Sequence, residues 1–169
     1  MPIMNLDMFK VRKGMGLVGP ALILMLGGML VSGVASAHGI ERVTDLRSLA
    51  QNGDGKPTLI MFASDSCPYC DRAEHRHLGP MSEDANYDGI QIRKVMLDRE
   101  EVRDFDGEVR RGHELGRAYG ARVVPTIMAF DAEGNPVGEP LIGIPNEQLY
   151  RSQIRQRIQQ ALRNNGESS

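Results

Sequence analysis

The chain has 169 residues, of which 20 are Lys or Arg and 22 are Asp or Glu, so its formal net charge is −2. A chain with this charge offers no broad basic surface for nucleic acid or for an anionic membrane. Its length suits a single domain that buries its own core without extra cross-links.

The first 37 residues have the pattern of a cleavable export signal. Three basic residues precede an apolar stretch over 15–34, and the small residues Ala35-Ser36-Ala37 follow it. Cleavage after Ala37 would leave 132 residues with a net charge of −4 and place them in the periplasm. The alternative is a retained membrane anchor, because the apolar stretch approaches the ~20 residues that span a bilayer.

Apolar residues at helical spacing predict a helix over 40–50, and turn-forming residues over 52–55 end it. The short apolar run Thr58–Ala63 predicts a strand that is covered on both faces. We predict a second strand over 90–97. The charged stretch 99–111 shows no sustained period and is predicted to be a surface loop.

Cys67-Pro68-Tyr69-Cys70 follows the first strand and opens a helix predicted to run to about His77. Cysteines three residues apart at a helix start lie within disulfide reach, and the first lies over the free N–H groups of the opening turn. Those groups favour a thiolate, the species that exchanges with disulfides. The motif therefore predicts Cys67 as the attacking nucleophile and Cys70 as the resolving thiol, and Pro68 suits the first helical position.

Two other interpretations of the cysteine pair stay open. A purely structural disulfide would stabilise little across so short a loop, since the entropic benefit grows with loop length. A metal site would need further ligands, and His75 or His77 could supply one, although the chain has no second CxxC. We expect both histidines to be exposed on the helix, and we predict no metal and no organic cofactor.

The remaining chain predicts a helix over 113–119, a strand over 123–130, and a hairpin turn into an antiparallel strand over 136–144. Pro125 is unusual inside a strand, because proline cannot donate a hydrogen bond to the ladder. A final helix begins near Pro145 and is followed by a flexible tail over 164–169. Its predicted buried face consists of Leu149, Ile154, Ile158 and Leu162.

This order of elements resembles the thioredoxin fold over residues 40–163, with a CxxC after the first strand and Val124-Pro125-Thr126 before a strand-turn-strand-helix segment. The resemblance implies an α/β fold in which helices flank a central mixed four-stranded sheet, in a domain of residues 38–163. It implies that Pro125 is cis and faces the CxxC, and that Val124, Pro125 and Thr126 bind the partner's extended backbone. Ser66, Pro68 and Tyr69 would be neighbours of the redox site.

Two positions depart from the thioredoxin pattern. Ser66 stands where thioredoxins usually have tryptophan, and Met61 stands where cytosolic thioredoxins have a buried acid. Proton transfer to Cys70 would then need water or another group, such as Asp65 or Asp71, although both are expected to be solvated loop charges.

The chain resembles in particular the exported thioredoxin-like proteins of bacteria, including periplasmic thioredoxins of sulfur oxidation and cytochrome c maturation. This implies an enzyme, a thiol–disulfide oxidoreductase that reduces a specific partner protein and takes electrons from a membrane protein. It implies no nucleic acid partner, and no membrane contact after the signal is cleaved.

Two alternatives to this function are an oxidase that donates its disulfide and a copper or zinc chaperone that uses Cys67, Cys70 and a histidine. Dedicated oxidases usually carry a large helical insertion that this chain lacks. The residues alone do not fix the direction of exchange.

Overall fold

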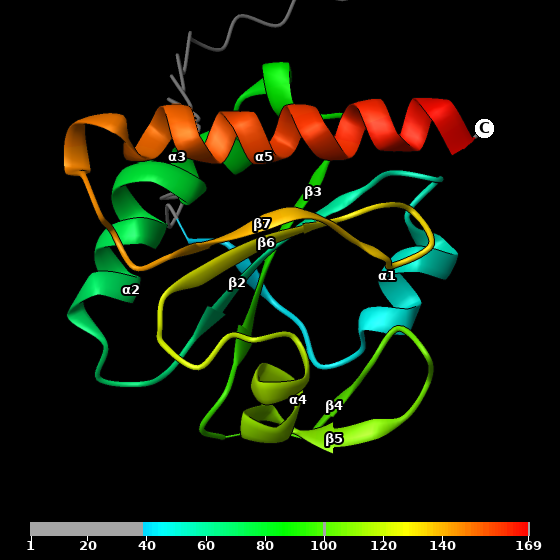
Figure 1. The fold of residues 1–169 in the computed structure, drawn as a ribbon, viewed down its shortest axis with the longest axis horizontal. Coiled ribbons are helices and arrows are strands. Elements are labelled where there is room, and N and C mark those ends of the chain that lie inside the picture. Colours follow the sequence, from blue (N-terminus) through cyan, green and yellow to red (C-terminus); the bar gives the residue numbers. More distant parts are fainter. Residues whose placement is uncertain (1–38, 100, 169) are drawn as a thin grey trace, which may run out of the picture. The chain divides into compact units, whose positions relative to one another are not determined.

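The computed structural model describes residues 39–99 and 101–168 (Figure 1). The predicted export signal, residues 1–37, lies outside them. Among the residues that are described, no helix is both long enough and apolar enough to cross a membrane.

A mixed sheet of five strands lies at the centre of the fold, in the order β1-β3-β2-β6-β7. The strands β1, β3 and β2 run parallel, whereas β6 is antiparallel to β2 and β7 is antiparallel to β6. The predicted α/β fold is confirmed, with one strand more than predicted. The strands are β1 (Glu41–Arg42), β2 (Thr58–Ala63), β3 (Gln91–Met96), β6 (Thr126–Phe130) and β7 (Pro136–Ile142).

Helices cover both faces of this sheet. They are α1 (Leu46–Asn52), α2 (Pro68–Ala73), the π-type turn η1 (Glu74–Leu78), α3 (Gly79–Ser82), the 3-10 turn η2 (Ala85–Tyr87), α4 (Gly112–Ala118) and α5 (Glu147–Ser168). Helical backbone thus continues to Ser82, beyond the predicted end near His77. Pro80 lies at the start of α3, directly after the π-type turn, so the change of helical type coincides with the missing N–H donor of the proline.

The strand β2 is buried along its whole length, as predicted, and its side chains alternate between two cores. Leu59, Met61 and Ala63 belong to the core beneath α2 and α5, which also contains Tyr150 and Ile154. Ile60 and Phe62 belong to the core on the other face, together with Leu46 of α1 and Leu115 of α4. The CxxC motif follows this strand, so a doubly covered, rigid element positions it.

The first predicted helix begins later than the sequence indicated. Residues 41–42 pair with β3 as strand β1, and α1 begins only after Asp45, whose carboxylate accepts the N–H of Ser48 at 2.9 Å. An aspartate in this position is a strong helix start signal, because its side chain satisfies a free donor of the first turn. The prediction of a helix over 40–50 was wrong for its first residues.

The prediction of a loop over 99–111 was also wrong. This stretch contains two antiparallel strands, β4 (Glu101–Arg103) and β5 (Val109–Arg111), which form a small separate sheet. Gly107, with a φ of 92°, supplies the left-handed backbone of the turn that joins them. Val102 is the buried residue of β4 and belongs to the core beneath α1 and α4.

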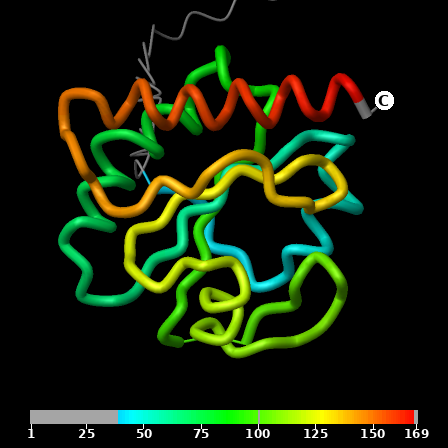
Figure 2. The backbone as a smooth tube through the Cα atoms, viewed as in Figure 1, coloured from blue at the N-terminus to red at the C-terminus, as the bar shows by residue number. Residues whose placement is uncertain are grey.

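The C-terminal helix α5 packs on β6 and β7 (Figure 2). Its buried face is one residue out of phase with the prediction at both ends, where Leu149 and Leu162 are 54% and 40% exposed. The helix also extends to Ser168, through most of the predicted flexible tail. The residues of α5 that enter the core are Tyr150, Ile154, Ile158 and Ala161.

Candidate active site

The CxxC motif lies where β2 passes into α2. Ser66 has a φ of 56°, which turns the chain sharply before the helix begins. Cys67 is the N-cap of α2 and Pro68 follows at the first helical position. Cys67 and Cys70 form a disulfide, and their Cα atoms are 5.2 Å apart. The pair therefore has the spacing that reversible closure requires.

The two sulfurs differ in their surroundings. The N–H of Cys70 points at Cys67 Sγ over 3.1 Å, so the helix start offers a donor to a thiolate on Cys67. Cys67 is half-buried, whereas Cys70 is only 3% exposed. The first cysteine is therefore more accessible from solvent than the second.

The residues next to the cysteines form the surface around the disulfide. Ser66, Pro68 and Tyr69 are all exposed, and Tyr69 is 57% exposed despite its large aromatic ring. The guanidinium of Arg72 lies 5.3 Å from the centre of that ring. An exposed aromatic side chain therefore lies two residues after Cys67.

Val124-Pro125-Thr126 lies at the start of β6, and the Val124–Pro125 peptide bond is cis. The hydroxyl of Thr126 donates to the carbonyl of Val123 at 2.6 Å. The N–H of Gly143 donates to the carbonyl of Pro125 at 2.7 Å. Val124 packs against the same buried cluster as Cys67, so the two predicted motifs meet at one core.

A further link holds the turn before Cys67 in place. The N–H of Asp65 donates to the carboxylate of Asp98 at 2.9 Å, and Asp65 itself forms an ion pair with Arg99. Asp65 was predicted to be a solvated loop charge, but it is half-buried and paired. These contacts join the turn that precedes the CxxC to the loop after β3.

Glu74 and Lys94 form a largely buried ion pair that was not predicted from the sequence. The Glu74 carboxylate accepts from Lys94 Nζ at 2.6 and 2.7 Å and from the N–H of Ile40 at 3.0 Å. Both side chains line a cavity of about 440 Å³ whose wall also includes Cys70. Two opposite charges therefore border the cavity that Cys70 also lines.

One signal in the sequence concerns Glu74, and the pairing with Lys94 appears only in the register of the sheet. Glu74 follows Cys70 by four residues, which places it on the same side of a helix. Lys94 is the register partner of Met61 across β2 and β3. Its charge therefore lies beside the position where a buried acid was expected.

The predicted exposure of the two histidines holds only for His75. His77 is 9% exposed, because it packs edge-to-face on Tyr150 with ring centroids 5.0 Å apart. Its Nε2 lies 3.5 Å from a carboxylate oxygen of Glu147. Within residues 39–99 and 101–168, no three His, Cys, Asp or Glu side chains come together in a group that could hold a metal ion.

Comparison with known proteins places these features in a family. The family model described as "Thioredoxin-like domain" matches residues 47–157. A search of curated protein sequences found no match.

Two solved structures show the same fold at low sequence identity. The thioredoxin of Fasciola hepatica is 16% identical, with a TM-score of 0.51, and covers 70% of this chain and 99% of its own. A point-mutant thioredoxin from Halobacterium salinarum is 24% identical, with a TM-score of 0.50, and covers 75% of this chain and 96% of its own.

Proposed function

Because the chain belongs to the thioredoxin-like domain family, we propose that it is an exported thiol–disulfide oxidoreductase whose reduced form breaks disulfides in specific partner proteins. The observation that carries the proposal is the asymmetric pair at the start of α2. Cys67 is half-buried and its sulfur faces a backbone donor, whereas Cys70 is buried. A thioredoxin-like fold with a CxxC pair at disulfide distance supports thiol–disulfide exchange as the class of reaction.

The exchange proceeds in two steps. The Cys67 thiolate attacks one sulfur of the partner disulfide, so that an S–S bond joins the proteins and the partner's other sulfur leaves as a thiolate. Cys70 then loses its proton and attacks Cys67 Sγ, which releases the partner's first sulfur. Two electrons pass to the partner, its two sulfurs end as thiols, and the Cys67–Cys70 disulfide remains until a membrane dithiol protein reduces it.

The segment before β6 suits a partner's backbone. Among the backbone hydrogen bonds in loops and turns of the described chain, none uses the N–H or the carbonyl of Val124. Both groups are therefore open to an extended segment that adds to the molecule edge to edge. Val124 lies beside the cis bond, and Val123 next to it is 57% exposed.

Export to the periplasm is the part of the proposal that rests on sequence alone. Residues 1–37 carry the signal pattern and lie outside the described residues. The compartment fits the chemistry, because disulfides form and persist outside the cytoplasm.

Reduction of insulin tests the exchange itself. The protein, kept reduced by a dithiol donor, is expected to precipitate insulin chains, and Cys67→Ser should abolish this activity. Cys70→Ser should stop after the first step and accumulate a mixed disulfide on Cys67. An adduct that forms equally with Cys67→Ser would reverse the assigned roles.

Redox titration of the pair against glutathione tests the direction. We expect a reduction potential of about −200 mV or lower, as in dithiol proteins that act as reductants. A potential near about −120 mV would instead identify an oxidase that donates its disulfide.

A further inference from the structure

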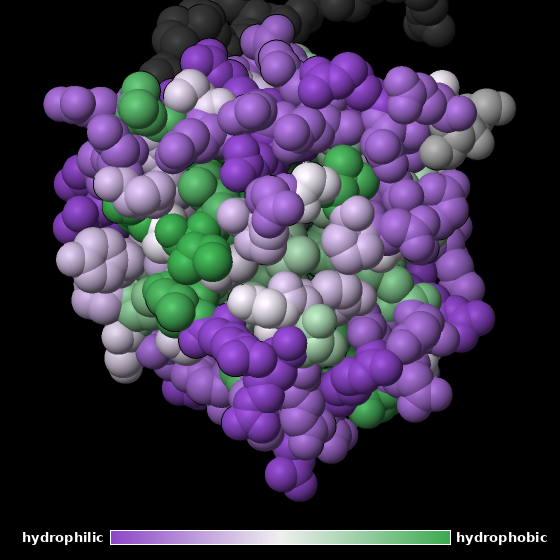
Figure 3. Space-filling model, viewed as in Figure 1, coloured by the Kyte–Doolittle hydropathy of each residue, from purple (hydrophilic) through white to green (hydrophobic). Residues whose placement is uncertain are grey.

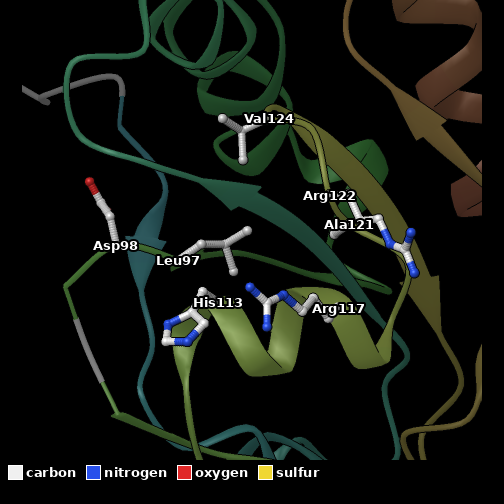
Figure 4. A pocket seen from close by; sticks show the side chains of 7 residues that line it. All are labelled: Leu97, Asp98, His113, Arg117, Ala121, Arg122 and Val124. Carbon is white, nitrogen blue, oxygen red and sulfur yellow. The ribbon is translucent and has the colours of Figure 1, made fainter.

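A cavity of about 690 Å³ lies between α4, the end of β3 and the segment that precedes the cis-proline. His113 and Arg117 rise from α4 toward Leu97, and Val124 lies across the cavity from them (Figure 4). The side chains that line it are Leu97, Asp98, His113, Arg117, Ala121, Arg122 and Val124.

Positive charge predominates in this lining. Arg117 and Arg122 are both exposed, and neither takes part in the ion pairs found in the described part of the chain. The lining has one acid, Asp98, and that carboxylate accepts the N–H of Asp65 at 2.9 Å. The cavity is thus a basic site on a chain whose formal net charge is −2.

The cavity adjoins the proposed redox site on two sides. Val124 lines it and precedes cis-Pro125. Asp98 also lines it and holds the turn that begins two residues before Cys67. A polypeptide bound at Val124 with its disulfide at Cys67 would therefore carry neighbouring side chains into or over this cavity.

The surface around it divides into an apolar and a polar part. Figure 3 shows apolar surface over the ends of β6 and β7 and hydrophilic surface over α4. Val123, which precedes β6, is 57% exposed, and Ile142, the last residue of β7, is 52% exposed. A partner segment that fits this division has apolar residues next to its cysteine and charged residues further along.

We propose that this cavity selects partner polypeptides with an acidic side chain close to the disulfide under attack. This inference rests on the function proposed above and names the class of partner. An Asp or Glu carboxylate can pair with Arg117 or Arg122, and the guanidinium fork suits the two oxygens of a carboxylate. A basic side chain at the same place would meet like charge.

Competing peptide substrates test the inference. Two peptides, each with the same internal disulfide, carry either two Glu or two Lys beside the reactive cysteine, and kcat/KM is measured for both with the reduced protein. Surface charges act weakly and are screened, so we expect the Glu peptide to be favoured about fivefold at low ionic strength. In molar salt the preference should fall below about twofold.

A matched pair of double variants locates the effect. Arg117→Gln with Arg122→Gln is expected to reduce the Glu-to-Lys ratio to about one. Arg151→Gln with Arg155→Gln removes the same charge from exposed positions of α5, which covers the opposite face of the sheet, and should keep the ratio.

Three results would overturn the inference: no preference in the unaltered protein, a ratio that survives in the Arg117 and Arg122 variant, or an equal loss in the α5 variant. The last would show that net charge acts from a distance. If neither peptide were reduced at all while both bound with equal affinity, the proposed function would fail together with the inference. A retained preference in binding without reduction would refute the redox function alone.

Discussion

Glu74 and Lys94 bring opposite charges into a largely apolar part of the molecule. Their side chains are 8% and 23% exposed, and the carboxylate is held by three hydrogen bonds, two from Lys94 and one from the N–H of Ile40. Removing one partner of such a pair leaves a poorly solvated charge, whereas replacing both can be nearly neutral. Each charge therefore offsets the cost of burying the other, and neither residue stabilises the fold by itself.

We predict that Glu74→Gln lowers the free energy of unfolding by about 2–4 kcal/mol, because Lys94 then keeps its charge without a carboxylate. Lys94→Met should cost a similar amount. The double variant should recover at least ~1 kcal/mol relative to the sum of the singles. Urea denaturation of the oxidised protein measures all four forms, and strict additivity would mean that the two charges do not interact.

At the scale of elements, Asp104 joins the β4–β5 hairpin to α4. It is 4% exposed, and its carboxylate accepts from the Tyr119 hydroxyl at 2.5 Å, from the N–H of Phe105 at 2.8 Å, and from Arg110. Arg110 also pairs with the exposed Asp106 at 2.8 Å, which lowers the pKa of Asp106. One arginine thus bridges a buried and an exposed carboxylate across the same hairpin.

Asp104→Ala is expected to destabilise the domain by about 2–3 kcal/mol, since it leaves the half-buried Tyr119 hydroxyl, a backbone donor and Arg110 without the carboxylate that accepts from them. Asp106→Ala removes the same charge from the exposed side of Arg110 and should have little effect. Thermal or urea unfolding of the two variants compares them directly. Equal losses would show that the hairpin is held by the surface pair and not by Asp104.

Elements with a regular apolar pattern were predictable from the sequence. The strand β2 is a continuous apolar run, and the order of the main strands and helices followed from such runs and from turn residues. The strands β4 and β5 have three residues each, too few for an alternating pattern to be recognised. The two-residue strand β1 is shorter still and precedes a helix cap, so the apolar spacing around it favoured a helix.

The errors within helices have a related cause. The π-type turn over Glu74–Leu78 widens the helix and changes the direction of the side chains within it, and His77 packs on Tyr150 instead of facing solvent. Regular helical spacing cannot indicate such a turn. In the candidate site the cysteines were predictable because their spacing is itself the signal. The Glu74–Lys94 pair was not, because its partners come from elements 20 residues apart.

On the scale of the whole molecule, each face of the sheet contains one tyrosine that is hard to ionise. Tyr150 is fully buried in the core beneath α5, and burial together with the negative charge of Glu147 raises its pKa. Tyr119 packs against the other core, where burial and the hydrogen bond to Asp104 raise its pKa. Both halves of the fold therefore favour the protonated phenol.

This arrangement predicts a loss of stability in alkali. Unfolded tyrosines ionise near pH 10, whereas the folded protein keeps these two protons to higher pH. The folded state then binds more protons than the unfolded state, so the free energy of unfolding falls as pH rises above about 10. The limit is ~1.4 kcal/mol per pH unit for each tyrosine.

Urea denaturation between pH 9 and pH 11.5 measures this slope. The double variant Tyr119→Phe with Tyr150→Phe should start from a different stability but show a much flatter dependence on pH, since phenylalanine has no proton to lose. An unchanged slope in the double variant would show that these two phenols do not cause the alkaline loss.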